Sequence, residues 1–474
     1  MRFSPSGQAR TLTAVLVVLI PRLAIAADDR IAAVEKAVQS GMRDFSIPGV
    51  AVGIYHKDFA YSRGFGVTSI ENPLPVTKDT LFTIASISKT FTGTAVMSLV
   101  EKGLLDLNAP VRKYLPDFRV KDEHASASAT VTTLLTHMGG WDGDYMINEY
   151  GNGDDALRRT VAGMFRLDQL APPHTRWSYN NSGLYVAGRL IEVVTGKSFE
   201  NALRDLVIRP LALTRTYLAP EEVMTLRFAV GHNISGGAPR ISRMWTLNRG
   251  SRPGGGVISC VTDMLQYARF HLGHGRPAAD RVLAPASLRR MQSPVVQRVD
   301  ADDQMAITWF WSNAGGLHTL WHGGGNQGQT TSLTLIPSRD FAVVVLTNGS
   351  TGPALYREIN RVAVREFLKV KENDPQVDPR FASGADAAIG RYSSAAAKLL
   401  VTAPGSELIV SRTPQQPVPA ATPEAPERFG FYAPDRLICL EGPARGSRME
   451  ILRNDDGSVG WIRHRYRLHK REVP

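Results

Sequence analysis

Residues 81–89 of the sequence read LFTIASISK. The first part of this stretch, Leu81 to Ala85, is an apolar run that leads directly into the tetrad at residues 86–89. Beyond the tetrad, apolar side chains recur at helical spacing. We therefore expect Ser86 to lie at or near the N-terminus of a buried helix that ends near Gly103.

Ser86 and Lys89 form a candidate catalytic pair. Three positions apart on a helix they share one face, so the amine can hydrogen-bond the hydroxyl and help to take its proton. Lys89 is the one lysine in the sequence with a serine at that spacing, although about one such match could arise by chance. A helix-capping serine with a solvent-facing lysine is the ordinary alternative. A helix N-terminus also offers partial positive charge and unpaired N–H groups, which favour a serine nucleophile and an oxyanion.

A second candidate motif is residues 177–183, WSYNNSG, just before a helix expected at Ser182 to Val194. It places Tyr179 and Asn181 on one short turn. If Lys89 supplied a nearby ammonium, the pKa of the phenol would fall and Tyr179 would become a better base. Asn181 offers both a donor and an acceptor, enough to orient the lysine and to hold a substrate carbonyl.

The third candidate motif is residues 321–326, WHGGGN, immediately before a strand expected at Thr330 to Ile336. Glycines let a substrate approach the backbone and expose N–H groups, as an oxyanion hole requires. A His-Gly-Gly-Gly run also occurs in esterases that carry a Gly-x-Ser-x-Gly nucleophile elbow. The sequence contains no such elbow, so the catalytic mechanism of those esterases is disfavoured.

The order Ser-x-x-Lys, Tyr-x-Asn, His-x-Gly resembles that of the serine β-lactamase and penicillin-binding-protein superfamily. The chain looks most like the branch of class C β-lactamases, DD-peptidases and family VIII esterases. Residues 134–140, LLTHMGG, and residues 253–259, PGGGVIS, resemble two further segments of that family. The resemblance covers roughly residues 30 to 370, and the motifs are specific when taken jointly.

The resemblance implies an α/β (α+β) fold, in which an antiparallel sheet is flanked by helices and carries a helical insertion, with the active site between them. It also implies a role for each matching residue. Ser86 would be the nucleophile, Lys89 and Tyr179 the proton-transfer pair, Asn181 a contact to substrate and lysine, His322, Gly324 and Gly325 the substrate-binding strand, and the N–H groups of Ser86 and Gly325 the oxyanion hole. His137, in contrast, is interpreted as a structural turn residue.

One position departs from the family pattern. β-Lactamases and many DD-peptidases present Lys-Thr-Gly or His-Thr-Gly where this chain has His322-Gly323-Gly324, and the threonine hydroxyl helps to hold the substrate carboxylate. Gly323 has no hydroxyl. The sequence therefore favours ester or amide substrates over strong β-lactam hydrolysis.

The remaining patterns predict how the chain is organised. A helix is expected over Ile31 to Phe45, a hairpin over Val50 to Phe65, a strand over Phe341 to Thr347 and a helix over Leu355 to Leu368. Strands at both ends of a mainly helical middle predict one sheet domain with an insertion. The expected domains are a signal peptide at 1–26, the hydrolase domain at 27–372, a linker at 373–381 and an all-β domain at 382–474.

The predicted C-terminal domain contains short strands near 407–411, 437–440 and 449–452, interrupted by a Pro-rich loop at 414–426. It resembles the lipocalin-like domain attached to some members of the family. Its last segment, residues 463–471, reads RHRYRLHKR, and its alternating arginines predict one strand with a water-facing basic side.

Composition restricts the function classes. The net charge is +11, but no segment resembles a nucleic-acid module, so no nucleic-acid partner is expected. No metal or other cofactor is expected either, because the sequence contains neither His-Glu-x-x-His nor a Cys/His cluster at zinc spacing. Cys260 and Cys439 could form one disulfide, but they lie in different predicted domains and are expected to be free, buried thiols.

The N-terminus predicts export. Arg2 and Arg10 precede an apolar run from Leu12 to Ile20, and residues 24–26, AIA, offer a small-x-small cleavage site. A membrane anchor is the alternative, but the run is too short to span about 30 Å of hydrocarbon. A periplasmic or extracellular protein with no stable membrane span after cleavage is expected.

Two functions from different classes fit the sequence. The first is a serine hydrolase that forms an acyl-enzyme with a small-molecule or peptide acyl substrate, namely an ester, a D-amino-acid amide or peptide, or a β-lactam. The second is a non-hydrolytic, penicillin-binding-like envelope protein that senses or binds peptidoglycan-type ligands. The acyl substrate and the oligomeric state are left open by the sequence.

Overall fold

The computed structural model describes residues 1, 28–145, 150–245, 247–274, 282–300, 303–415 and 425–472. Residues 2–26 of the expected signal segment and most of the Pro-rich stretch at 414–426 lie outside these ranges. In the described ranges, no helix combines the length and the apolarity needed to cross a bilayer.

The first domain is built on an antiparallel sheet of eight strands. In chain order they are β1 (Gly49–His56), β2 (Phe59–Gly66), β7 (Val296–Asp300), β8 (Asp303–Met305), β9 (Phe310–Ala314), β10 (Leu317–Asn326), β11 (Gln329–Ile336) and β12 (Phe341–Thr347). In space the order is β2-β1-β12-β11-β10-β9-β8-β7, so β1 pairs directly with β12. The prediction of one sheet interrupted by an insertion is confirmed.

Helices cover both faces of this sheet. On β1, Val52 and Ile54 face a cluster that includes helices α1 (Asp29–Asp44) and α11 (Gly352–Leu368). Ala51 and Tyr55, on the opposite side of the same strand, face helices α2 (Ser88–Glu101) and α9 (Val261–His271). Because successive strand residues point to opposite faces, apolar residues at consecutive positions bury the strand on both sides.

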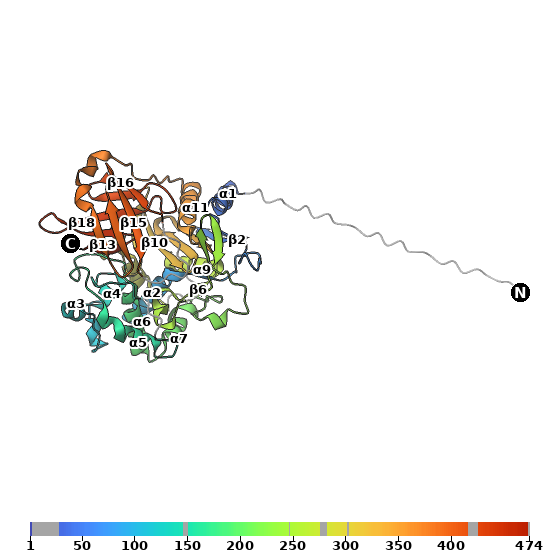
Figure 1. Ribbon diagram of the computed structural model, residues 1–474. Helices are drawn as coiled ribbons and strands as arrows, with labels where there is room; N and C mark the ends of the chain where they lie inside the picture. Colours follow the sequence, from blue (N-terminus) through green and yellow to red (C-terminus); the bar gives the residue numbers. More distant parts are fainter. Residues whose placement is uncertain are drawn as a thin grey trace.

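The insertion is mainly helical and lies on the α2 side of the sheet, in the lower part of Figure 1. The side chain of Asn180 accepts a hydrogen bond from Gly183 N–H at 2.8 Å and so caps helix α6 (Asn181–Thr195), whose C-cap is Gly196 in the left-handed conformation. The remaining elements of this region are α3 (Glu123–Ser128), α4 (Val131–Leu135), α5 (Ala156–Ala162), α7 (Phe199–Leu203), α8 (Arg252–Gly255), α10 (Pro285–Gln292) and the strand pairs β3 (Phe82–Thr83) with β6 (Ile258–Ser259) and β4 (His232–Ser235) with β5 (Ala238–Ile241).

The C-terminal domain is a closed eight-stranded barrel. Its strands are β13 (Gly390–Ser393), β14 (Ala397–Thr402), β15 (Glu407–Pro414), β16 (Glu427–Ala433), β17 (Arg436–Cys439), β18 (Arg448–Arg453), β19 (Val459–His464) and β20 (Arg467–Arg471). Side chains such as Tyr392, Phe429 and Phe431 belong to its buried core. Eight strands enclose a space that side chains can fill, so this barrel is a packed domain.

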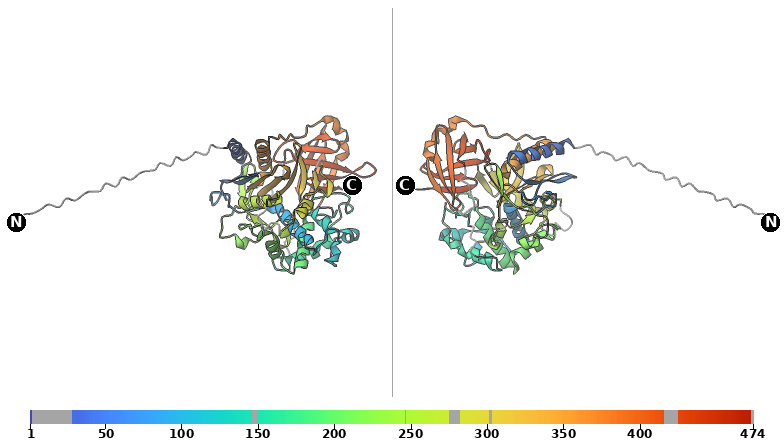
Figure 2. Two further views of the ribbon diagram at one scale, coloured as in Figure 1. Left: turned by 180° about the vertical axis from the view of Figure 1, so that it is seen from behind. Right: turned by 45° about the vertical axis from the view of Figure 1, so that its right-hand side comes forward.

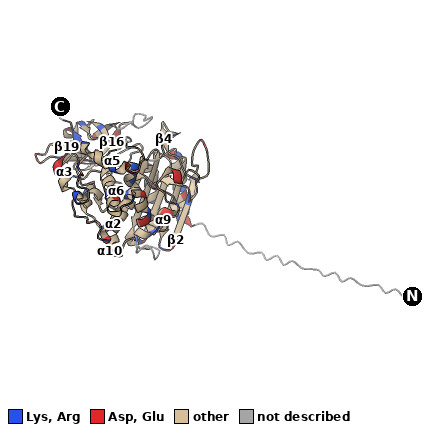
Figure 3. Ribbon diagram, turned by 90° about the horizontal axis from the view of Figure 1, so that it is seen from below, with Lys and Arg blue, Asp and Glu red and all other residues tan. Residues whose placement is uncertain are grey.

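The barrel packs beside the sheet and against the helical insertion (Figures 1 and 2). The indole N–H of Trp461 donates to Leu170 O at 2.8 Å, and Ala395 N–H donates to Asp142 Oδ2 at 2.5 Å. Both cysteines are buried and free, as expected. In the view of Figure 3, basic and acidic positions are interspersed and do not gather in one region.

Most predicted elements of regular structure are found, with one correction. Residues 463–471 form two strands that meet at a turn of Arg465 and Tyr466, both with positive φ. Arg463 is only 4% exposed and donates to Trp177 O at 3.1 Å, because the barrel docks through this surface. The prediction of one strand with a water-facing basic side is therefore wrong. Residues 321–326 lie at the end of strand β10 and come just before β11, as expected.

Candidate active site

Ser86 lies in a single 3₁₀ turn, Ala85–Ile87, which joins β3 to α2. Ala85 has φ +47°, a left-handed conformation that is uncommon outside glycine and that turns the chain sharply before the serine. Lys89 is the second residue of α2, and its Nζ lies 3.0 Å from Ser86 Oγ. The two residues are therefore in direct contact, with Ser86 just ahead of the helix that was expected to begin there.

Lys89 is completely buried. Its Nζ also donates to Gly254 O at 2.6 Å. Burial holds the pKa of Lys89 well below its usual value, the charge of Arg467 lowers it further, and the carboxylate of Asp144 opposes both. A neutral amine can accept a hydrogen bond from the Ser86 hydroxyl and can take its proton.

Tyr179 covers this pair. Lys89 Nζ lies 5.0 Å from the centroid of its ring. Burial raises the pKa of the phenol, and this effect exceeds the lowering by a hydrogen bond with Ser86 and by the charge of Arg467. The expectation that Lys89 lowers the pKa of Tyr179 is not met, because the buried lysine disfavours its own ammonium form. Tyr179 is thus a protonated phenol beside the candidate nucleophile, and the buried ring of His137 packs against it at 4.7 Å.

Asn181 lies on the same turn but has a different partner from the one expected. Its Nδ2 donates to Asp144 Oδ1 at 2.7 Å, and no hydrogen bond to Lys89 is found between these described residues. Asp144 was not a sequence candidate, since it lies in a Gly/Asp-rich loop without a recognisable motif. Its role becomes visible only when the fold brings residues 144 and 181 together.

His322 lies on β10, with its ring centroid 6.2 Å from that of Tyr179. It is 1% exposed, and its Nδ1 donates to Gly323 O at 2.6 Å, because a carbonyl oxygen can only accept. Burial and the charge of Lys89 lower its pKa to about 3. At neutral pH His322 is therefore an uncharged ring whose Nε2 is an acceptor, so it cannot supply a cation to hold a carboxylate.

The glycines of β10 allow this strand to lie against the segment that leads to Ser86. A Cβ at Gly324 would lie 2.4 Å from Ile84 O, closer than any side chain tolerates, whereas nothing lies within 4 Å of a Cβ at Gly325. Ser86 is the second residue of its turn, where N–H groups have no partner within the helix. This arrangement is consistent with an oxyanion hole formed by the N–H groups of Ser86 and Gly325, which remains a prediction.

A cavity of about 500 Å³ opens above Ser86 and Tyr179. The sequence indicated three parts of its lining, namely Ser86, Tyr179 and the strand carrying His322, but two further parts were not foreseen. Helix α11 contributes Tyr356 and Arg357, and the barrel contributes the turn between β19 and β20. The lining residues are Ser86, Tyr179, Phe310, Trp321, His322, Gly323, Gly324, Gly325, Thr330, Ser350, Thr351, Pro353, Tyr356, Arg357, Pro443, Ala444, Ser447, Arg465, Tyr466 and Arg467.

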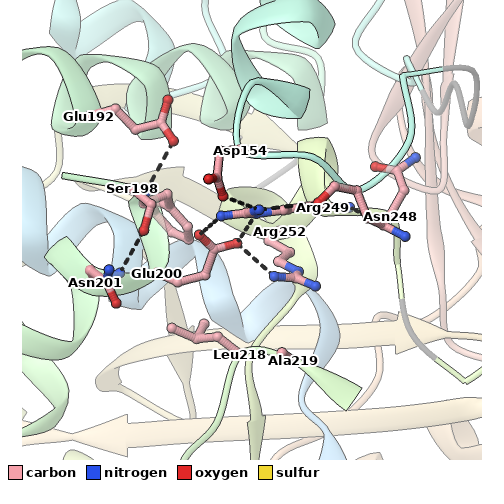
Figure 4. A network of polar contacts seen from close by, with 12 residues as sticks. Asp154, Glu192, Ser198, Glu200, Asn201, Leu218, Ala219, Asn248, Arg249 and Arg252 are labelled. Atoms are coloured by element: carbon pink, nitrogen blue, oxygen red, sulfur yellow. Dashed lines mark hydrogen bonds and ion pairs between the residues drawn. The ribbon is translucent and has the colours of Figure 1, made fainter. Parts of the chain in front are cut away.

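Another cavity, of about 820 Å³, lies beside α6 and α7 and contains mainly charged side chains. Glu200 at its centre pairs with Arg249 at 3.1 Å and with Arg252 at 2.7 Å, and Arg249 also pairs with Asp154 at 2.7 Å (Figure 4). These charges satisfy one another, and no nucleophile with an adjacent base lines the cavity. The cavity above Ser86 is therefore the better candidate for catalysis.

Comparison with known proteins identifies the family of the chain. The sequence matches the family described as "Beta-lactamase" over residues 34–366. It is 32% identical over 344 residues to "Penicillin-binding protein 4" of Amycolatopsis lactamdurans, covering 70% of this chain and 90% of that protein. It is 28% identical over 327 residues to "Unguisins hydrolase ungD'" of Aspergillus campestris, covering 66% of this chain and 60% of that protein.

The fold of the whole chain also has a counterpart among solved structures. The structure titled "Crystal structure of SurE with D-Leu" aligns with a TM-score of 0.71 at 22% identity. The alignment covers 94% of this chain and 100% of the other, so it includes the barrel. At this identity the likeness shows a shared fold.

Proposed function

Because the chain belongs to the beta-lactamase family, a family of serine acyl-transferases and hydrolases, we propose that it hydrolyses acyl substrates through a covalent acyl-enzyme on Ser86. The observation that carries this proposal is the 3.0 Å contact between Ser86 Oγ and the fully buried Nζ of Lys89, at the base of a 500 Å³ cavity. A nucleophile with a base in hydrogen-bond reach is the arrangement that covalent catalysis requires.

In the proposed acylation step, Ser86 Oγ attacks the substrate carbonyl carbon while its proton passes to the neutral amine of Lys89. The N–H groups of Ser86 and Gly325 stabilise the negative charge that develops on the carbonyl oxygen. The bond to the leaving group then breaks, and the phenol of Tyr179 donates its proton to the departing oxygen or nitrogen. Tyr179 is restored by the proton that Lys89 accepted, and water hydrolyses the acyl-enzyme by the reverse sequence of proton transfers.

For the acyl donor we propose an ester or a D-amino-acid amide or peptide in preference to a β-lactam. Support comes from the aromatic lining of the cavity by Phe310, Trp321 and Tyr356, which suits an apolar acyl group. The absence of a threonine at Gly323 and the uncharged state of His322 weaken carboxylate binding at β10. Among the relatives, one is titled a hydrolase of unguisins and one carries D-Leu in its structure.

We also propose that the segment at residues 1–26 directs export, so that the enzyme acts in the periplasm or outside the cell. The arginine-flanked apolar run and the AIA site support this placement. Mass spectrometry of the protein from its native host tests it: a mature N-terminus beginning at residue 27 is expected, and an intact residue 1 in a cytoplasmic fraction would contradict it.

A fluorophosphonate probe tests the nucleophile. The wild type is expected to gain one covalent label on Ser86, whereas Ser86→Ala gains none. Ser128→Ala, which changes a half-buried serine on α3 outside the cavity, should label normally. Turnover of a p-nitrophenyl ester that is lost in Ser86→Ala would exclude the non-hydrolytic binding protein. Equal labelling of the wild type and Ser86→Ala would refute the proposal. Parallel kinetics with the ester, a chromogenic cephalosporin and a D-Ala-D-Ala peptide rank the three substrate classes.

A further inference from the structure

The turn between β19 and β20 brings the C-terminal barrel into the active site of the first domain. Tyr179 N–H donates to Tyr466 O at 2.8 Å, and Leu468 N–H donates to Ser178 Oγ at 3.1 Å. The backbone of Tyr179 is thus held by the barrel, which means that the position of its phenol depends on how the barrel is docked.

Arg467, the first residue of β20, crosses the same interface with its side chain. Its Nη2 donates to Asp144 Oδ1 at 3.0 Å and its Nε donates to Asp144 Oδ2, a bidentate pair. Its Cζ lies 5.1 Å from the centroid of the Tyr179 ring. Asp144 also accepts the hydrogen bond from Asn181, so one carboxylate joins the barrel to the turn that follows Tyr179.

Burying the charges of Asp144 and Arg467 lowers the free energy of unfolding unless both partners of the ion pair are present. The side chain of Asp144 is 9% exposed and that of Arg467 is 29% exposed. Two charges held so far out of water are tolerated when paired, and removal of one leaves the other without compensation. A bidentate guanidinium–carboxylate contact also fixes orientation, which a single ammonium does not.

We propose that Arg467 is a positioning residue of the active site, which acts through Asp144 and Asn181 to hold the segment of Tyr179 beside Ser86 and Lys89. The barrel thereby completes the catalytic site, and turnover requires it to be docked. This inference rests on the proposed function of Ser86 as nucleophile. It assigns Arg467 no contact with the reacting atoms.

The charges around Lys89 predict that Arg467 and Asp144 affect the pH dependence of activity in opposite directions. The titratable side chains that face Lys89 are Asp144, His137, Tyr179, His322 and Arg467. Among them, the carboxylate raises the pKa of Lys89 and the guanidinium lowers it. While paired, the two act on the pKa of Lys89 in opposite directions. Loss of Arg467 leaves a carboxylate that favours the lysine ammonium, whereas loss of Asp144 leaves a guanidinium that disfavours it.

The role of Arg467 is tested by steady-state kinetics on the full chain. The hydrolysis of p-nitrophenyl butyrate is measured as a function of pH. Arg467→Met is expected to lower kcat about 10- to 100-fold, the scale of a small misplacement of a catalytic group. It should also move the acid limb of the kcat/KM profile to higher pH. Asp144→Asn should move that limb to lower pH. Arg467→Lys keeps the charge without the bidentate contact, so its profile should stay near that of the wild type while kcat is only partly restored.

The matched control is Arg471→Met, the same change on the same strand. Arg471 donates to Ala387 O at 2.9 Å and to Ile389 O at 2.7 Å, within the barrel and away from the cavity. It should match the wild type in kcat and in pH profile. Circular dichroism and thermal unfolding of each variant separate misfolding from a loss of positioning.

Three results would overturn the inference. They are wild-type kcat in a folded Arg467→Met, a shift of the acid limb in the same direction for Arg467→Met and Asp144→Asn, and a rise in KM alone, which would mean that Arg467 contacts the substrate. Activity that persists in Ser86→Ala would instead refute the proposed function, so the two failures are distinguishable.

Discussion

A Cβ at position 323 would lie 3.5 Å from the hydroxyl oxygen of Tyr356, which is the nearest atom to it. That distance is ordinary van der Waals contact, so β10 has room for a side chain there. Tyr356 extends from α11 to the wall of the catalytic cavity. The cavity therefore holds a phenol beside the place where similar enzymes carry a threonine.

Gly323→Thr is expected to fold and to shift the substrate preference toward β-lactams. The added hydroxyl can hold a substrate carboxylate, and one hydrogen bond to a charged group corresponds to a change of about tenfold or more in relative kcat/KM. The ratio of cephalosporin to p-nitrophenyl ester turnover measures the effect. Gly324→Thr is the matched control, because its Cβ would meet Ile84 O at 2.4 Å and both activities should fall with the melting temperature. An unchanged ratio in a folded Gly323→Thr would contradict the expectation.

Lys89→Met should reduce turnover at least about 100-fold, the usual scale for a general base. In the wild type, kcat/KM should rise with pH through an ionisation below the usual lysine value of 10.5, because burial lowers the pKa of Lys89 and only the neutral amine can accept a proton. Activity is therefore lost as pH falls. A Lys89→Met variant with unchanged rate would argue against Lys89 as the base.

Tyr179→Phe should discriminate between leaving groups. Tyr179 is a protonated phenol at neutral pH, because burial raises its pKa, and it is therefore placed to donate a proton. A p-nitrophenolate can leave without being protonated, whereas an alcohol or an amine leaving group must be protonated as its bond to the acyl carbon breaks. The variant should lose about 100-fold more activity on an anilide or alkyl ester than on a p-nitrophenyl ester with the same acyl group. Equal losses on both would assign Tyr179 to a step other than departure of the leaving group.

Local patterns were sufficient to predict much of the fold. The run of apolar residues on β1 and the helical spacing on α1 and α11 can be recognised from residues only a few positions apart. The Ser86 and Lys89 contact is of the same kind, since three positions on one helical turn fix it.

Contacts between distant residues could not be predicted in this way. Arg467 and Asp144 are separated by 323 positions, and no spacing rule joins a barrel strand to a loop of the insertion. The same holds for Tyr356, which reaches the cavity only because α11 packs on the sheet. The expectation of a low pKa for Tyr179 was wrong for a related reason. A sequence shows which residues can carry a charge, but it does not show that Lys89 is removed from water.

Asp300, the last residue of β7, is expected to limit the stability of the protein at neutral and alkaline pH. It is 3% exposed, and no partner for its Oδ1 is found among the described residues. Burial, together with the nearby Asp303, raises its pKa to about 7, although Arg463 opposes this. At 1.36 kcal/mol per pKa unit, keeping Asp300 ionised costs the folded protein about 4 kcal/mol.

Asp300→Asn replaces the acid with a neutral isostere and should remove that cost. The folded pKa lies above the unfolded value of 3.8, so the stability that the protonated acid contributes is complete below about pH 4 and is lost as pH rises through about 7. Urea unfolding should therefore show equal stability for the wild type and Asp300→Asn near pH 4, with the variant more stable by a few kcal/mol at pH 8. Asp117→Asn, at an exposed position, should show no such divergence. A difference between the wild type and Asp300→Asn that does not change with pH would mean that packing, and not ionisation, distinguishes them.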